Sequence, residues 1–334
     1  MKSTPNSSST TMKAVAFAAG VSTATVSRVF TSPEKVSTAT RQRVESAAIT
    51  LGYSITPFYP REITSRWRKI LVIIADVTDT FYSEIIRGLE MQASEHYCLI
   101  TLFDCAHQSM NRYITTTRSL PEGYDGLIYV GLPPSAIDRR SPLPSVVINE
   151  FSSDYDAPTV HIDNLSASFN AVNYLIQRGH QRIACVTGPE ELTVCQSRRQ
   201  GYLQALQRHN FPLNPYYITR GDFTFKSGLA AAEQLLTLPT PPDAIFCHND
   251  KMALGVMYRA KKLGIAVPRQ LSVIGFDDIE ESQYAEPPLT TVSQPRTAQG
   301  ETAISLLTTL MEGKPLIHRS YLLETELILR QSTR

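Results

Sequence analysis

Polar and aromatic side chains stand where predicted strands of this chain end, and their types suit the binding of a small polar molecule. Aromatic rings stack on a planar ring, while carboxylates and amides bind hydroxyl groups, a combination that suits a nucleoside or a sugar. The alternatives are loop capping for the acid and amide side chains and core packing for the aromatic ones. The candidate effector-binding residues are Asp79, Phe81, Tyr82, Asn149, Arg198, Phe223, Asn249, Asp277 and Gln294.

Acid-base catalysis is the alternative chemistry for such side chains. It would rely on the adjacent carboxylates Asp277 and Asp278 or on a histidine. Adjacent carboxylates on a turn point in different directions, and no GxSxG, phosphate-binding loop or metal-ligand spacing accompanies them. The five cysteines are scattered without a CxxC pair, which predicts small buried side chains and neither a disulfide framework nor a zinc site. We therefore expect no catalytic residue, no metal and no cofactor. The histidine of such a site would be His161, His180 or His248.

The elements that position these residues follow from an alternation of apolar strand-like runs and amphipathic helical stretches that begins at Ile70. The alternation occurs twice, with ILVIIADV and DGLIYVG in one half and RIACVTGP and DAIFCHND in the other. We predict an α/β core of two doubly wound parallel-sheet lobes with a ligand cleft between them, because ligands bind beyond the carboxyl ends of such strands. The N-lobe is predicted at about 70–161 and 292–318, and the C-lobe at about 162–291 and 319–334.

Charge is distributed unevenly between the start of the chain and the rest. Residues 1–69 contain ten Lys or Arg against three Glu, a net of +7, so a total of +1 leaves −6 for the remainder. A basic segment attached to an acidic body indicates a polyanionic partner for the first part. A solvated basic tail is the alternative on charge alone.

The string VSTAT occurs twice in this basic part, at 21–25 and 36–40. Apolar residues recur at helical spacing in three blocks between Thr11 and Leu51, which predicts three helices. Ser22 and Ser37 are good N-cap residues, so both copies of the string are expected to begin helices. In the first copy, Val21 and Val26 have the spacing of a hydrophobic staple, which the second copy lacks.

The outward face of the second predicted helix is small and polar and has no acid, so it can approach a phosphate backbone closely. Helix N-termini also attract phosphates, so we expect Ser22 and Thr25 to bind the backbone while Thr23, Ala24 and Arg28 contact base edges. The second copy of the string caps a supporting helix. The candidate DNA-binding residues are Ser22, Thr23, Ala24, Thr25, Ser27, Arg28, Thr31, Lys35, Ser37 and Tyr53.

The pattern GVSxxTVSR, followed by VSxxTRxRV and LGY, resembles the helix-turn-helix of the LacI family of bacterial repressors. The remainder resembles the periplasmic-binding-protein-like core of that family. FYSEIIRGLE, FCHNDKMALG and PPLTTVSQPR are similar to motifs of its nucleoside-responsive members. The resemblance implies a homodimer that binds operator DNA, represses genes of nucleoside uptake and catabolism, is induced by cytidine and acts with the cAMP receptor protein. Another nucleoside, a purine base or a sugar is the alternative effector.

Family members usually have a short hinge helix after LGY, with a leucine that enters the minor groove. Here Pro60 and Glu62 oppose such a helix, so we expect a disordered N-terminus at 1–10, a helix-turn-helix domain at 11–56 and a linker at 57–69 with a weak or absent hinge helix. No apolar run reaches the roughly 18 residues of a membrane helix, and no secretory signal precedes the domain. We expect a cytoplasmic protein, which disfavours a transport-type binding protein.

Overall fold

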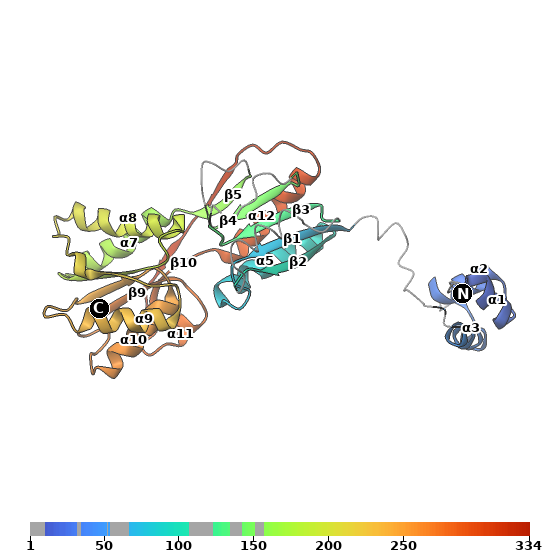
Figure 1. Ribbon diagram of the computed structural model, residues 1–334, viewed down its shortest axis with the longest axis horizontal. Helices are drawn as coiled ribbons and strands as arrows, with labels where there is room; N and C mark the ends of the chain where they lie inside the picture. The colour runs from blue at the N-terminus through green and yellow to red at the C-terminus, as the bar shows by residue number, and fades with distance from the viewer. Residues whose placement is uncertain are drawn as a thin grey trace, which may run out of the picture. The chain divides into compact units, whose positions relative to one another are not determined.

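The computed structural model describes residues 11–31, 35–51, 53, 67–106, 123–133, 142–150 and 157–334 (Figure 1). The chain divides into two compact units, Met1–Trp67 and Arg68–Arg334. The predicted disorder at 1–10, the end of the predicted helix-turn-helix domain at 54–56 and the predicted hinge at 57–66 lie outside the described residues.

The first unit contains the three predicted helices, so that prediction is confirmed. Their apolar faces meet in a small core that includes Val15, Val26 and Val44, each fully buried. Gly20 ends the first helix with a φ of 64°, the left-handed conformation that a tight helix C-cap requires. The helices are α1 (Met12–Ala19), α2 (Thr23–Thr31) and α3 (Thr38–Thr50).

The second unit contains two six-stranded sheets. We call the first sheet with its helices the first lobe; its strands run in the order β11-β5-β4-β3-β1-β2 and all pair in parallel. Alternate strand residues face opposite sides, and one side packs against α5 (Thr80–Glu95) and α12 (Arg296–Met311). The strands are β1 (Arg68–Ile74), β2 (Cys98–Asp104), β3 (Gly126–Val130), β4 (Ser145–Ile148), β5 (Thr159–Ile162) and β11 (Ser320–Leu323).

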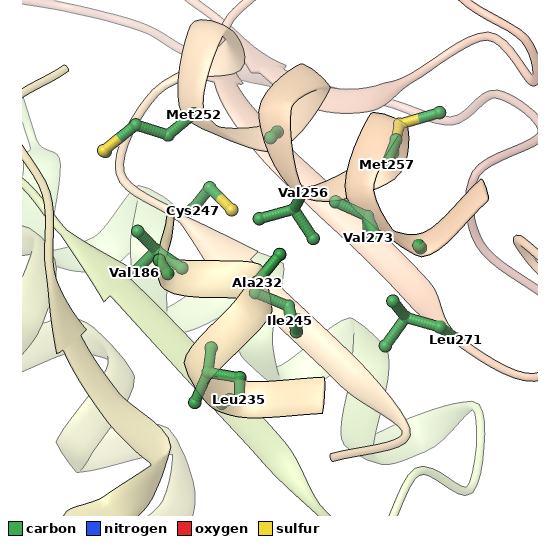
Figure 2. Close-up of a cluster of buried hydrophobic side chains, with 14 of the residues drawn as sticks. Val186, Ala232, Leu235, Ile245, Cys247, Met252, Val256, Met257, Leu271 and Val273 are labelled. Carbon is green, nitrogen blue, oxygen red and sulfur yellow. The ribbon is translucent and has the colours of Figure 1, made fainter. Parts of the chain in front are cut away.

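The second lobe is built on the sheet β12-β10-β9-β8-β6-β7, in which only β12 pairs antiparallel. Figure 2 shows the core on the side covered by α9 and α10, where Ala232, Leu235 and Val256 meet Ile245 and Val273 of the sheet. Helices α7 and α8 cover the other side. The elements are α7 (Asn164–Gln177), β6 (Ile183–Thr187), α8 (Thr193–Arg208), η3 (Pro215–Tyr217), β7 (Ile218–Arg220), α9 (Phe225–Leu236), β8 (Ala244–Cys247), α10 (Asp250–Lys262), β9 (Ser272–Asp277), α11 (Glu281–Tyr284), β10 (Thr290–Ser293) and β12 (Glu326–Ile328).

The predicted fold class is thus confirmed, whereas strand pairing moves the lobe boundaries by a few residues. The core begins at Arg68, because β1 already pairs with β2 there. β10 pairs with β9 as far as Ser293, so the chain leaves the second lobe after 293 and not after 291. β11 pairs with β5 of the first lobe, so residues 320–323 belong there and not to the predicted C-lobe segment.

Two findings bear on what this fold can bind. Within the described ranges, no helix combines the length and apolar character that a bilayer crossing requires. In the same part of the chain, no group of three or more His, Cys, Asp or Glu side chains is arranged to hold a metal ion. All five cysteines are free thiols, and all except the half-buried Cys105 are buried.

Candidate functional site

All nine candidate effector-binding residues line one cavity between the two lobes, with an empty volume of about 520 Å³ that includes its open mouth. The first lobe contributes the segment after β1 and the end of β4. The second lobe contributes α8 and the segments that follow β7, β8 and β9.

Three cavity residues hold the backbone in the left-handed region, where residues other than glycine are strained. Asn149 has a φ of 74°, Phe223 of 68° and Asp277 of 109°. Each such residue costs about 1–3 kcal/mol and persists only where surrounding contacts hold it in place. Strained residues from three separate segments thus meet around one cavity.

Asp277 lies at the centre of a buried polar network. Its Oδ1 accepts a hydrogen bond of 2.7 Å from Nε2 of Gln294 and lies 3.6 Å from Nη1 of Arg198. The Arg198 guanidinium also donates to Oδ1 of Asn164 at 2.8 Å and to the His248 carbonyl, and it stacks 3.7 Å from the centre of the Phe276 ring. Arg198 is therefore fixed by several partners and cannot turn freely towards a ligand.

Burial dominates the electrostatics of this network. Loss of hydration raises the pKa of Asp277 from 3.8 to about 6, although Arg198 and the Gln294 hydrogen bond both lower it. Burial, with repulsion from Asp277, also raises the pKa of the neighbouring Asp250 to about 7. Asp277 therefore carries a charge that the folded protein solvates poorly, and hydrogen-bond donors on a ligand would improve its environment.

Polar contacts join the lobes beside the cavity. Nζ of Lys251, on α10, lies 2.8 Å from Oδ1 of Asp79, the N-cap of α5. At the other side, the backbone amide of Thr193 donates to Oε2 of Glu150 at 3.0 Å, and the Thr193 hydroxyl donates to the same oxygen. Both contacts form between residues of different lobes, so a change in the lobe angle would alter them.

Some aromatic and amide residues of the cavity wall also have the alternative roles of core packing or helix capping. Phe81 and Tyr82 pack edge to face at 5.0 Å and also contact the first-lobe core, so they both pack and line the cavity. Burial raises the pKa of Tyr82, which keeps its hydroxyl neutral. Asn249 caps α10 by accepting from the Met252 amide at 3.0 Å, and its Nδ2 donates to the Phe223 carbonyl. Its capping role therefore exists alongside its place in the cavity wall.

Five further residues line the cavity but were not predicted from the sequence. Glu150 had a weak signal, since it stands beside the candidate Asn149 at a predicted strand end. Leu192 and Val194 had none, because an apolar residue in a helix start gives no indication of which surface it faces. The missed residues are Gly131, Glu150, Asn164, Leu192 and Val194.

In the first unit, α2 presents the face that the sequence predicted. Thr23, Ala24 and Arg28 are exposed, and Ser27 is half-buried. Oγ of Ser22 accepts from the Thr25 amide at 3.1 Å and lies 2.9 Å from the Thr25 hydroxyl, so the predicted N-cap is confirmed.

The second VSTAT copy caps α3 in the same manner, since Oγ of Ser37 accepts from the Thr40 amide at 3.3 Å. Lys35 and Ser37 are both exposed, whereas Tyr53 packs against the three-helix core. Thr31 ends α2, and its side chain lies outside the described part of the structure. Among the described side chains, the candidates on α2 and at its N-cap are therefore at least partly exposed, and Tyr53 is half-buried.

Comparisons with known proteins agree with this architecture. Residues 11–55 match the family model of bacterial regulatory proteins of the lacI family, and residues 172–333 match that of a periplasmic binding protein-like domain. The HTH-type transcriptional repressor CytR of Escherichia coli (strain K12) is 48% identical over 338 residues, covering 100% of this chain and 99% of that protein. The ribose operon repressor of the same strain is 36% identical over 304 residues, 89% of this chain and 92% of that protein.

A solved structure extends the likeness to the fold of both units. The lac repressor dimer bound to operator and the anti-inducer ONPF has a TM-score of 0.74 at 26% identity, covering 98% of this chain and 99% of that chain. These relatives are repressors and not enzymes. The chain belongs to the lacI family of bacterial regulatory proteins, and it is a DNA-binding transcriptional repressor.

Proposed function

We propose that this repressor binds cytidine in the cavity between its lobes and releases its operator when cytidine binds. The observation that carries the proposal is that all nine candidate residues, chosen for stacking and for binding hydroxyl groups, surround one cavity. Another nucleoside, a purine base or a sugar is the second candidate, because the same side chains would also bind those molecules.

The charges of the cavity wall favour a neutral ligand over a phosphorylated one. Asp79, Glu150 and Asp277 line the cavity, and Arg198, the cation among its described lining residues, already has several protein partners. A phosphate would meet repulsion from the carboxylates without a free cation to bind it. The ribose hydroxyls of a nucleoside instead donate hydrogen bonds, which carboxylates accept.

We further propose that α2 enters the major groove, with Thr23, Ala24, Ser27 and Arg28 at base edges and Ser22 and Thr25 at phosphates. The exposure of this face and its lack of acidic residues support the proposal. Thr31, Lys35, Ser37 and Tyr53 complete the proposed interface near the backbone. The likeness to a repressor dimer bound to operator supports action as a homodimer in the cytoplasm.

The proposed mechanism is a linkage between lobe angle and DNA binding. A ligand that contacts both lobes favours one lobe angle, and the two DNA-binding units of a dimer then lose their joint fit to the operator. The resemblance described above supports two further proposals: that the regulated genes serve nucleoside uptake and catabolism, and that the cAMP receptor protein binds DNA beside the repressor.

Calorimetry of the full chain against cytidine, uridine, adenosine, adenine, ribose and cytidine 5′-phosphate tests the ligand. We expect cytidine to bind most tightly and the 5′-phosphate to bind far more weakly. Tighter binding of a purine base or a free sugar would replace cytidine by the second candidate. Equal binding of cytidine and its 5′-phosphate would contradict the charge argument.

A further inference from the structure

We propose that Arg330, near the end of the chain, is a positioning residue that holds the turn carrying Asp277 in its ligand-binding geometry. The proposal rests on the proposed function, since it assumes that Asp277 contacts the effector. Arg330 itself does not line the cavity. Any effect on ligand binding must therefore act through the turn.

The turn is one that the local sequence would not hold by itself. Asp277 and Asp278 are consecutive non-glycine residues with φ values of 109° and 56°. Both lie in the left-handed region, which is unfavourable for residues with a Cβ, and two in succession add their costs. Such a backbone persists only where contacts from other segments fix it.

Arg330 supplies one such contact from the C-terminal tail. Nη2 donates to Oδ1 of Asp278 at 2.7 Å, and Nη1 donates to the Leu289 carbonyl at 2.8 Å. The planar guanidinium thus joins the turn to a neighbouring backbone segment, which a single ammonium cannot do with the same geometry. Both side chains of the Arg330–Asp278 ion pair are mostly buried, with exposed fractions of 16% and 21%.

The tail that carries Arg330 is itself fixed to the second lobe. The Arg330 amide donates to Oγ1 of Thr290 at 3.0 Å, and the Gln331 amide donates to the Pro288 carbonyl at 3.0 Å. Ser332 continues the attachment by donating its hydroxyl to the Val273 carbonyl at 2.6 Å. Arg330 therefore contacts Asp278 from a tail that is itself held in place, as a positioning residue requires.

A second guanidinium also contacts the turn. Nη2 of Arg296, at the start of α12, donates to the Asp278 carbonyl at 2.8 Å, and its Cζ lies 5.9 Å from the centre of the Phe81 ring. Arg296 belongs to the first lobe and lies beside a cavity residue, so its replacement would also disturb the cavity wall. Arg330 is the better test, because it fixes the turn from outside the cavity.

The test measures cytidine affinity by calorimetry in the full chain with Arg330→Met, Asp278→Asn and the double variant. We expect each single change to weaken binding by about tenfold, or about 1.4 kcal/mol. The double variant should be no worse than either single one, because all three lack the same ion pair. Arg330→Lys should recover part of the affinity. The matched control is Arg334→Met, which removes a tail arginine placed near His180 and should leave affinity unchanged.

A readout without ligand separates this proposal from the proposed function. The Ile279 amide, which donates to Oδ2 of Asp250 at 3.0 Å, reports on the turn by hydrogen exchange. We expect its exchange to become faster in Arg330→Met and in Asp278→Asn and to stay unchanged in Arg334→Met. Unchanged exchange, or an affinity loss that the Arg334 control shares, would overturn the positioning role. A wild-type chain that binds no nucleoside would instead refute the proposed ligand while the exchange result still decides the role of Arg330.

Discussion

Asp277→Asn removes a buried charge while keeping the shape of the side chain, and we expect it to stabilise the free protein while weakening effector binding. The expectation follows from the two opposing effects at this carboxylate. Loss of hydration disfavours its charged form, whereas Arg198 and Gln294 favour that form. The net rise in its pKa indicates that the loss of hydration is the larger effect.

The size of the expected gain in stability follows from the pKa shift of Asp277. A pKa of about 6 in place of 3.8 corresponds to roughly 3 kcal/mol by which folding disfavours the ionised carboxylate, since one pKa unit is about 1.4 kcal/mol. An asparagine mimics the protonated acid, so the variant should gain up to about 3 kcal/mol at pH 7.5. The ligand loses a charged hydrogen-bond acceptor, which should weaken binding by roughly 10- to 100-fold.

The pH dependence gives a second check on the sign. The folded protein holds the Asp277 proton more tightly than the unfolded chain, so this residue contributes stability below pH 3.8 that is lost as the pH rises through about 6. The stability gained by Asp277→Asn should accordingly be close to zero below pH 3.8 and grow to its full value above pH 6. Wild-type effector affinity should fall below about pH 6, whereas the variant's affinity should not change there.

Urea unfolding of the second unit in the full chain and calorimetry with cytidine would measure the two effects. Asp163→Asn is the matched control, because Asp163 is an exposed N-cap of α7 and asparagine caps a helix about equally well. A variant at Asp277 that is less stable than wild type at pH 7.5 would show that the ion pair with Arg198 outweighs the loss of hydration. Undiminished cytidine affinity would refute the role of Asp277 in binding.

Three further predictions concern the DNA-binding unit and the contact between lobes. Arg28→Ala should weaken DNA binding by roughly tenfold in fluorescence anisotropy and leave cytidine affinity unchanged; an equal loss of both would contradict separate sites. Ser22→Ala and Ser37→Ala should each destabilise their helix by about 1 kcal/mol in hydrogen exchange, yet only Ser22→Ala should lower DNA affinity, and equal losses would refute the distinction between the two VSTAT copies. Lys251→Met removes its ion pair with Asp79 of the other lobe and should weaken cytidine binding a few-fold, unlike the control Lys261→Met, whose exposed pair with Glu286 lies within one lobe; matched effects would exclude a role for lobe contact.

The sequence was informative where a function depends on local patterns. Helical spacing and N-cap chemistry predicted the three helices of the first unit, because both act within a few residues along the chain. The cavity residues were predictable for a similar reason. Parallel strands of one sheet place their carboxyl ends at the same edge, so polar residues at those ends gather even when they are far apart in sequence.

The features of the fold and the site that could not be predicted from the sequence depend on contacts between distant segments. SYLL and ELI have the same strand-like character, so only pairing in space assigns β11 to the first lobe and β12 to the second. The position of Glu150 depends on its hydrogen bond with Thr193, a residue of the other lobe. The raised pKa of Asp277 likewise follows from burial, which no local pattern indicates.

The most direct measurement is the affinity of the full chain for an operator duplex, selected by the wild-type chain from a randomised library, with and without saturating cytidine. We expect cytidine to weaken DNA binding at least about tenfold in the wild type, and Asp277→Asn to need roughly 10- to 100-fold more cytidine for the same effect. Operator affinity that stays the same while calorimetry shows cytidine bound to the cavity would contradict the linkage between the two sites.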